Sequence, residues 1–185
     1  MYSSKSSKIN WNINYQKLLC YKKSVIIYDL TYLFCTRYIN PKDRTYDQMI
    51  QAARSGKQNI VEGYGALATS KESGIKLFNV ARASLMELYE DYNDYLRVRG
   101  MRTWENESKE SKAMNKLGFE NSDSHYFTSL AESRNEETIA NMAIVLIKQG
   151  LTLIHRYLER VSENFSNEGG FREQMTQIRL ENRRR

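Results

Sequence analysis

Arg54 and Lys57 are the residues whose type and spacing point most directly to a chemistry. They lie three positions apart, so on a helix they share one face, and small residues surround them in the run Ala-Ala-Arg-Ser-Gly-Lys. Arg44 precedes them on the same predicted helix. Such a basic face is typical of contact with phosphate groups without recognition of bases. The alternative is that Arg54 pairs with an acidic neighbour and Lys57 is only solvated.

Support for enzymatic chemistry is weak. The chain has two histidines, His125 and His155, and lacks Gly-x-Ser-x-Gly, phosphate-loop and Gly-x-Gly-x-x-Gly motifs. It also lacks the Glu-x-x-His pairs that a di-metal site in a helical bundle needs. His155 and Glu159 form the one candidate acid–base pair, without a nucleophile. We therefore predict a protein that is not an enzyme, with no catalytic residues, no metal and no cofactor.

An acidic cluster is the other charged feature, at Glu87, Glu90, Asp91 and Asp94. Its members form two pairs at i,i+4 spacing, whereas the apolar stripe of the same segment points elsewhere. A solvated acidic face is the simplest interpretation. The functional alternative is a landing site for a basic partner helix.

Charge is distributed unevenly along the 185 residues. The net charge is +6, made up of +7 in residues 1–57, zero in 58–104, −3 in 105–165 and +2 in 166–185. A basic excess of this kind is compatible with a polyanionic partner. It is equally compatible with an ordinary solvated surface. The three C-terminal arginines, Arg183, Arg184 and Arg185, are further candidates for nucleic-acid contact.

Composition also indicates the cellular setting. The N-terminus is rich in Ser and Lys and has no apolar signal core, and no uninterrupted apolar run approaches the roughly 18 residues of a membrane span. Cys20 and Cys35 have neither metal-binding nor redox spacing. We expect reduced thiols, a cytoplasmic location and no membrane partner.

The elements that position these residues are predicted to be long helices, because the chain has one Pro and nine Gly. Apolar periodicity predicts helices over residues 15–38, 43–64, 69–100 and 133–165. The fold class is therefore all-α, an up-down-up-down four-helix bundle. The expected divisions are an N-terminal extension at 1–21, the bundle at 22–165 with a polar insertion at 101–134, and a C-terminal suffix at 166–185. Short helices are expected within the insertion near 108–116 and 122–132.

The helix boundaries follow from local signals. The Asn40-Pro41 pair ends the first helix, and Gly63 with Gly65 is expected to stop the second. Thr69 with Glu72 and Ser133 with Glu136 have capping-box spacing at the starts of the third and fourth. Gly56, inside the second helix, predicts close approach of a neighbouring helix.

The fourth helix carries two apolar stripes, so it is predicted to be buried on more than one side. One stripe is Ile139, Met142, Leu146, Leu153 and Tyr157, and the other is Ile144, Ile147, Leu151, Ile154, Leu158 and Val161. A four-helix bundle buries one face of each helix. We therefore expect the second stripe to contact the C-terminal tail or another subunit.

One run in the second helix resembles a family signature. The run Ser-x-x-x-Asn-Ile-x-Glu-Gly, with Ser55, Asn59, Glu62 and Gly63 as its structural motif, resembles that of the protein encoded in intervening sequences of bacterial 23S rRNA genes. That family is a four-helix-bundle family that also includes the accessory variability proteins of diversity-generating retroelements. The segment at 81–88 is similar to its third-helix pattern, and 168–173 is similar to the suffix of one subgroup. From the residues themselves, we expect Glu62 to have a specific partner, either Arg54 or a residue of another helix.

The resemblance implies a bacterial, positively charged bundle that assembles into a homopentamer and has no catalytic residues. For the retroelement members it also implies binding to a reverse transcriptase and to RNA or DNA. The function expected is thus a non-enzymatic nucleic-acid-binding accessory protein. The alternative is a structural protein-interaction scaffold, in which the tail, the acidic face and the 101–134 insertion bind a protein.

Overall fold

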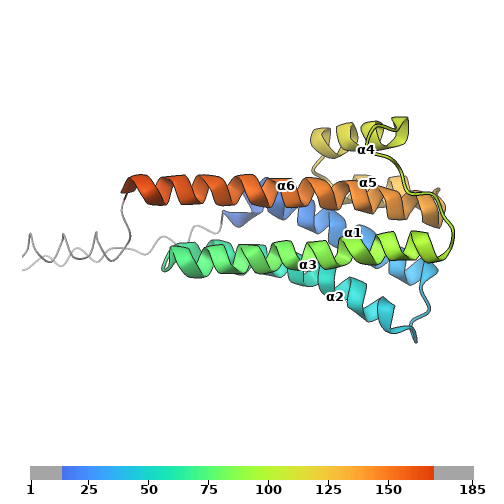
Figure 1. Cartoon of the computed structure of the whole chain (residues 1–185), viewed down its shortest axis with the longest axis horizontal. Helices are drawn as coiled ribbons and strands as arrows, with labels where there is room; N and C mark the ends of the chain where they lie inside the picture. The colour runs from blue at the N-terminus through green and yellow to red at the C-terminus, as the bar shows by residue number, and fades with distance from the viewer. Residues whose placement is uncertain (1–13, 169–185) are drawn as a thin grey trace, which may run out of the picture.

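The structure is a computed structural model that describes residues 14–168, with side chains through residue 163. All regular elements in this range are helical, which confirms the all-α prediction (Figure 1). They are a short 3-10 helix, η1 (Tyr15–Lys17), followed by α1 (Leu19–Tyr38), α2 (Arg44–Leu67), α3 (Lys71–Val98), α4 (Lys109–Glu120), α5 (Ser124–Glu132) and α6 (Glu136–Glu168). The two short helices expected in the insertion are present as α4 and α5.

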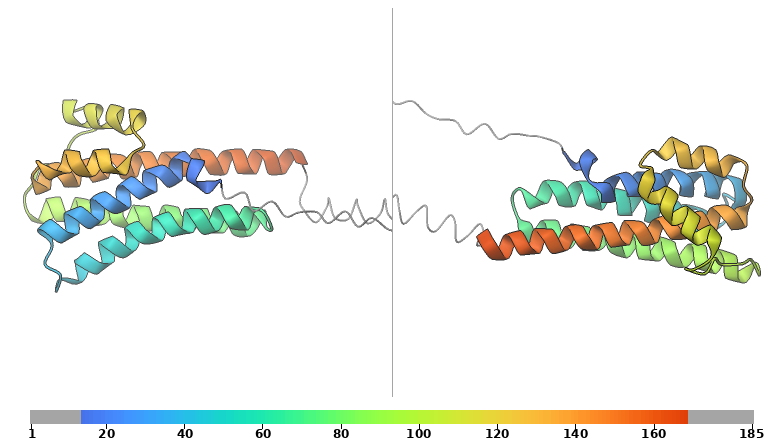
Figure 2. Two further views of the ribbon diagram at one scale, coloured as in Figure 1. Left: turned by 180° about the vertical axis from the view of Figure 1, so that it is seen from behind. Right: turned by 90° about the horizontal axis from the view of Figure 1, so that it is seen from above.

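The four long helices pack side by side in a bundle-like arrangement (Figures 1 and 2). The α2–α3 pair makes the most extensive contact, and α1–α6, α1–α2 and α3–α6 complete the set. The two short helices lie outside this set, with α5 against α1 and α4 against α6. The insertion is therefore an additional helical layer on one side of the long helices.

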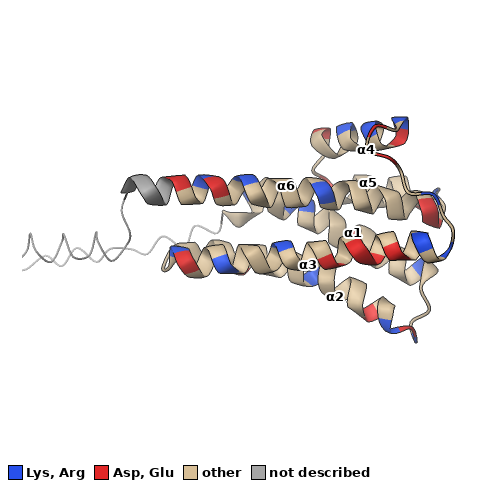
Figure 3. Ribbon diagram, in the orientation of Figure 1, with Lys and Arg blue, Asp and Glu red and all other residues tan. Residues whose placement is uncertain are grey.

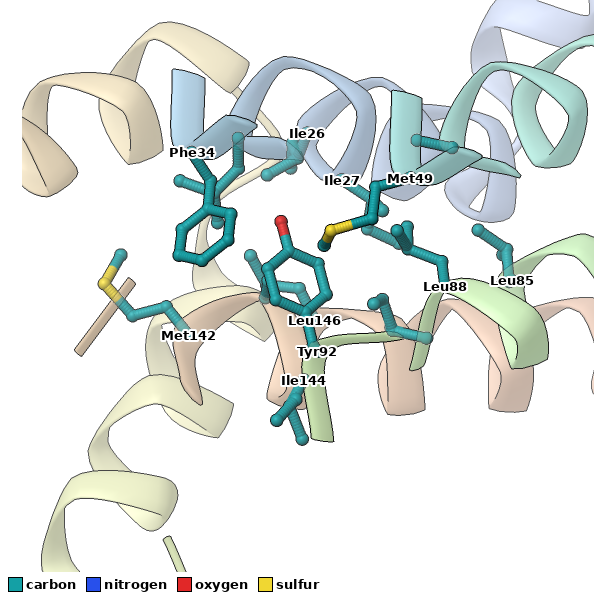
Figure 4. Packing of buried hydrophobic residues seen from close by; sticks show 14 of the residues in the cluster. Ile26, Ile27, Phe34, Met49, Leu85, Leu88, Tyr92, Met142, Ile144 and Leu146 are labelled. Atoms are coloured by element: carbon teal, nitrogen blue, oxygen red, sulfur yellow. The ribbon is translucent and has the colours of Figure 1, made fainter. Parts of the chain in front are cut away.

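Tyr92 of α3 lies at the centre of the core (Figure 4). Its ring contacts that of Phe34 in α1, with 5.0 Å between centroids, and its hydroxyl donates a hydrogen bond of 3.1 Å to Thr31 Oγ1. Thr31 is fully buried as well. The hydrogen bond satisfies both polar groups, so the aromatic side chain contributes its apolar burial, about 1.5–3 kcal/mol, with little polar penalty.

Glycines form a close seam between α2 and α3. A Cβ on Gly56 would lie 2.7 Å from Leu85 Cδ2, and one on Gly63 would lie 2.8 Å from Phe78 Cδ2 and 3.2 Å from the Gly74 carbonyl oxygen. The predicted close approach at Gly56 is confirmed. The prediction that Gly63 and Gly65 stop the second helix is wrong, because α2 continues to Leu67. Gly63 serves packing instead, since a missing Cβ lets two helix backbones approach.

At both predicted capping boxes, the structure has a different residue as the N-cap from the one predicted. Ser70, not Thr69, precedes α3 and its side chain accepts a hydrogen bond of 3.2 Å from the Ser73 N–H. At the start of α6, the Asn135 side chain accepts one of 3.0 Å from the Thr138 N–H. In both cases the N-cap residue lies one or two positions further along the chain than the capping-box pattern predicted. Ser, Thr and Asn are all good N-cap residues, and more than one of them stands at each helix start.

We expect Ser70→Ala to lower the free energy of unfolding by about 1 kcal/mol, because the substitution leaves a backbone N–H of the first turn of α3 without its acceptor. Thr69→Ala is the matched control, and its effect should stay within about 0.5 kcal/mol. Urea titrations of both variants test this. A larger loss for Thr69→Ala would restore the original capping prediction.

The second apolar stripe of α6 is buried within the described chain over its first half. Ile144 and Ile147 are 3% and 0% exposed, and α1, α3 and α4 all pack on this helix. The buried Asn141 side chain accepts from the Trp104 N–H at 2.6 Å and donates to the Arg102 carbonyl at 2.8 Å, which holds the segment before α4 in place. The expectation of a tail or subunit contact is therefore wrong for this half. The tail beyond residue 168 lies outside the described residues.

A buried polar cluster fixes α4 to the long helices. Lys23 of α1 is 5% exposed and its Nζ donates a hydrogen bond of 2.5 Å to the Gly118 carbonyl. Gln149 of α6 donates to the Asn115 carbonyl at 2.8 Å, while its own Oε1 is buried without a hydrogen-bond partner. Burial lowers the pKa of Lys23 to about 8. Polar groups thus anchor α4 at a cost in desolvation.

Candidate nucleic-acid interface

Arg54 and Lys57 lie together on the outer side of α2, as predicted. Arg54 is exposed, and no ion pair involving it is found within residues 14–163. Lys57 is half-buried, and its Nζ lies 4.1 Å from the ring centroid of Tyr28 in α1. A cation over a tyrosine ring gains about 0.5–1 kcal/mol and keeps its charge. Within the described residues, the pair therefore presents one guanidinium without an ion pair beside one positioned ammonium.

Arg44 does not join this pair. It is the first residue of α2 and is exposed. Ten residues separate it from Arg54, which corresponds to about 15 Å along a helix. It could contact only a separate phosphate of an extended polyanion. The other predicted contacts, Arg183, Arg184 and Arg185, lie outside the described residues.

One residue of the family-like motif, Ser55, bonds α2 to α3, and a second, Asn59, bonds to Ser55 within α2. Ser55 Oγ and Ser84 Oγ are 2.9 Å apart, and Ser84 is buried. Asn59 Nδ2 donates to the Ser55 carbonyl at 2.9 Å and to Ser55 Oγ at 3.1 Å. Together with the packing of Gly63, these bonds give the motif a structural role at the α2–α3 seam.

Glu62, the fourth residue of that motif, behaves differently. Its side chain is exposed, and within residues 14–163 it has neither an ion pair nor a side-chain hydrogen bond. The expected partner, whether Arg54 or a residue of another helix, is therefore not found there. One reason is distance, because Arg54 and Glu62 are two helical turns apart.

The acidic cluster lies in the second half of α3 (Figure 3). It borders a groove of about 440 Å³ between α3 and α6, which is lined by Met86, Glu87, Tyr89, Glu90, Asp91, Lys148 and Leu151. Burial, together with the carboxylates of Glu87 and Asp94, raises the pKa of Asp91. Glu87, Glu90 and Asp94 are exposed, so the expected solvated acidic face describes three of the four carboxylates.

The candidate acid–base pair lies on open surface. His155 Nε2 is 3.3 Å from Glu159 Oε1, and the two side chains are 61% and 56% exposed. Within the described residues, no group of three or more His, Cys, Asp or Glu side chains is arranged to hold a metal ion. Cys20 and Cys35 are buried and unpaired, and burial raises their thiol pKa values to about 11 and about 12. Neutral thiols of this kind are poor nucleophiles.

A basic groove that the sequence patterns did not predict lies between α6 and the segment formed by η1 and the start of α1. It has a volume of about 270 Å³ and brings together Lys17, Arg156 and Arg160. The two arginines have i,i+4 spacing on α6, which was a visible signal. Lys17, however, is more than 130 positions away in the chain. Only the packing of α1 against α6 reveals that the three residues line one groove.

Among the described residues, one helix is long and apolar enough, by length and composition alone, to cross a membrane. The segment Glu136–Glu163 of α6 contains an 18-residue window of mean hydropathy 1.3, and 67% of that window is buried inside the protein. Core helices of bundles commonly have this character.

Comparisons with known protein families, curated proteins and solved structures give no match to this chain.

Proposed function

We propose that the chain is a non-enzymatic accessory protein that binds the phosphate backbone of RNA or DNA through the outer side of α2. The observation that carries the proposal is the exposed Arg54 guanidinium beside the Lys57 ammonium over Tyr28. Two adjacent cations without carboxylate partners among the described residues can bind a polyanion without first breaking an ion pair. Tyr32, which is 52% exposed on α1, adds aromatic surface suited to nucleic acid.

The finer assignments follow from the family resemblance and belong to the same proposal. The long helices form an up-down-up-down bundle, and copies of the chain assemble into a homopentamer in the bacterial cytoplasm. A reverse transcriptase of a retroelement is the proposed protein partner. The packing of each long helix on two others is compatible with this topology.

Charge reversal tests the phosphate contact. Arg54→Glu with Lys57→Glu should weaken binding of a fluorescent single-stranded RNA at least tenfold, and the slope of log affinity against log salt should fall by about 2. Lys112→Glu with Lys116→Glu on α4 is the matched control, because it changes net charge equally on exposed side chains elsewhere. Equal losses in both double variants would leave only a net-charge effect and refute the α2 assignment.

A protein-interaction scaffold is the second candidate, favoured by the largely apolar α3–α6 groove with its acidic border. Light scattering after size-exclusion chromatography, with absorbance at 260 and 280 nm, distinguishes the two. An oligomer that sheds 260-nm absorbance at high salt supports nucleic-acid binding, and a nucleic-acid-free oligomer at low and high salt supports the scaffold. A monomer in the same light-scattering measurement would refute the proposed assembly. In a separate experiment, loss of a bound protein partner on truncation after Phe165 would support the scaffold.

A further inference from the structure

The groove between η1 and α6 combines three cations with an apolar wall. Lys17 comes from η1, and Arg156 and Arg160 come from α6. All three side chains are exposed, and none has an ion pair within residues 14–163. Among the described residues, no carboxylate lines the groove. Three cations that line one groove without a described counter-charge give a positive local potential that attracts an anion.

The start of α1 adds to this potential. Leu18 precedes the helix and provides no side-chain cap, and the first turn contains no acidic residue. The N–H groups of that turn therefore retain partial positive charge, and Leu18, Leu19 and Cys20 of this turn line the same groove. The helix end strengthens the attraction that the three side chains already provide.

The apolar side chains of the groove, which together form its apolar wall, are Leu19 of α1 and Leu153 and Tyr157 of α6. Leu153 and Tyr157 alternate along α6 with Arg156 and Arg160, so apolar surface and cations lie side by side in the groove. The volume of about 270 Å³ exceeds what a single phosphate group needs. A lining that combines cations with apolar surface matches a ligand with an aromatic base at one end and a phosphate at the other.

We propose that this groove is a nucleotide-binding site, in which Lys17, Arg156 and Arg160 bind the phosphate and the wall of Leu19, Leu153 and Tyr157 packs against the base. The ligand class is a 5′-mononucleotide or one nucleotide unit of a strand. The site is separate from the pair on α2, and it rests on the proposed function only in that the nucleotide would belong to a bound nucleic acid.

The test is calorimetric titration of the full chain with adenosine 5′-monophosphate, adenosine and inorganic phosphate at low ionic strength. The nucleotide should bind at least tenfold more tightly than either fragment, because it contacts both the cations and the apolar side chains. Arg156→Ala with Arg160→Ala should weaken nucleotide binding at least tenfold, since charge-assisted bonds to phosphate are lost. Lys112→Ala with Lys116→Ala is the matched control, and circular dichroism checks the fold of each variant.

The outcomes separate this site from the α2 pair. Nucleotide binding that is absent, or unchanged in Arg156→Ala with Arg160→Ala, overturns the site even where RNA still binds. Equal affinity for phosphate and nucleotide overturns the base-binding wall. Nucleotide binding that depends on Arg156 and Arg160 supports the groove as a site. Unchanged RNA binding in Arg54→Glu with Lys57→Glu would refute only the α2 assignment.

Discussion

Replacing Gly63 with alanine is expected to lower the free energy of unfolding by about 1–3 kcal/mol. The new methyl group would lie 2.8 Å from Phe78 Cδ2 and 3.2 Å from the Gly74 carbonyl oxygen. Phe78 is fully buried and packs on Tyr157 with 4.8 Å between ring centroids, so its ring has little room to move. The Gly74 carbonyl belongs to the backbone of α3, so relief of that contact requires the two helices to separate.

Alanine also favours a helix over glycine by about 1 kcal/mol, which partly offsets the clash. Gly65 isolates this contribution, because it lies two residues further along α2 and its Cβ would meet nothing within 4 Å. Gly65→Ala should therefore raise the free energy of unfolding by about 0.5–1 kcal/mol. Urea or thermal unfolding of the two variants should show shifts of opposite sign. Shifts of the same sign would mean that the α2–α3 seam is looser than these distances indicate.

The same glycines show what the sequence could and could not predict. Apolar periodicity located the four long helices, because burial on one face repeats every three to four residues whatever lies opposite. It could not tell a glycine that ends a helix from one that admits a neighbour, because that depends on α3, which Gly63 meets only after folding. Gly56 lies deep inside the predicted helix, so a helix end was not an alternative there and only close packing remained as the prediction.

The insertion at 101–134 shows the same limit at larger scale. Its short helices were predicted from local pattern, but its position over α6 was not, because isolated anchors such as Trp104 carry no information about where they bind. A doubly apolar helix therefore suggested contact with the C-terminal tail or with another subunit, whereas other helices of the described chain already bury Ile144 and Ile147.

The candidate site divides in the same way. Arg54 and Lys57 were predictable, since three positions on one helix fix their shared face. The cations of the η1–α6 groove come from the two ends of the described chain, and no spacing rule connects Lys17 with Arg160. Non-local sites of this kind need the packing of the long helices before they can be seen.

The free energy of unfolding should depend on pH through Lys23, and the Lys23→Met variant should remove that dependence. Burial lowers the pKa of this ammonium from its ordinary value of 10.5 to about 8. Between these values the unfolded chain binds a proton that the folded chain has lost, so the Lys23 contribution to stability rises with pH. The slope approaches 1.36 kcal/mol per pH unit, and the total is about 3 kcal/mol. Below pH 8 both states are protonated and the contribution is constant.

The measurable quantity is the stability of Lys23→Met minus that of the wild type, from urea titrations between pH 7 and 10.5. Burial raises the pKa of the Cys20 and Cys35 thiols, and their opposite pH dependence is common to both proteins and cancels. The difference should fall by about 2–3 kcal/mol across this window, because only the wild type gains stability as the buried ammonium deprotonates. Lys22→Met, at the exposed neighbouring position, is the matched control. The same pH dependence in both variants, or none for Lys23→Met, would mean that water reaches the Lys23 ammonium and that the contact of α4 with α1 opens in solution.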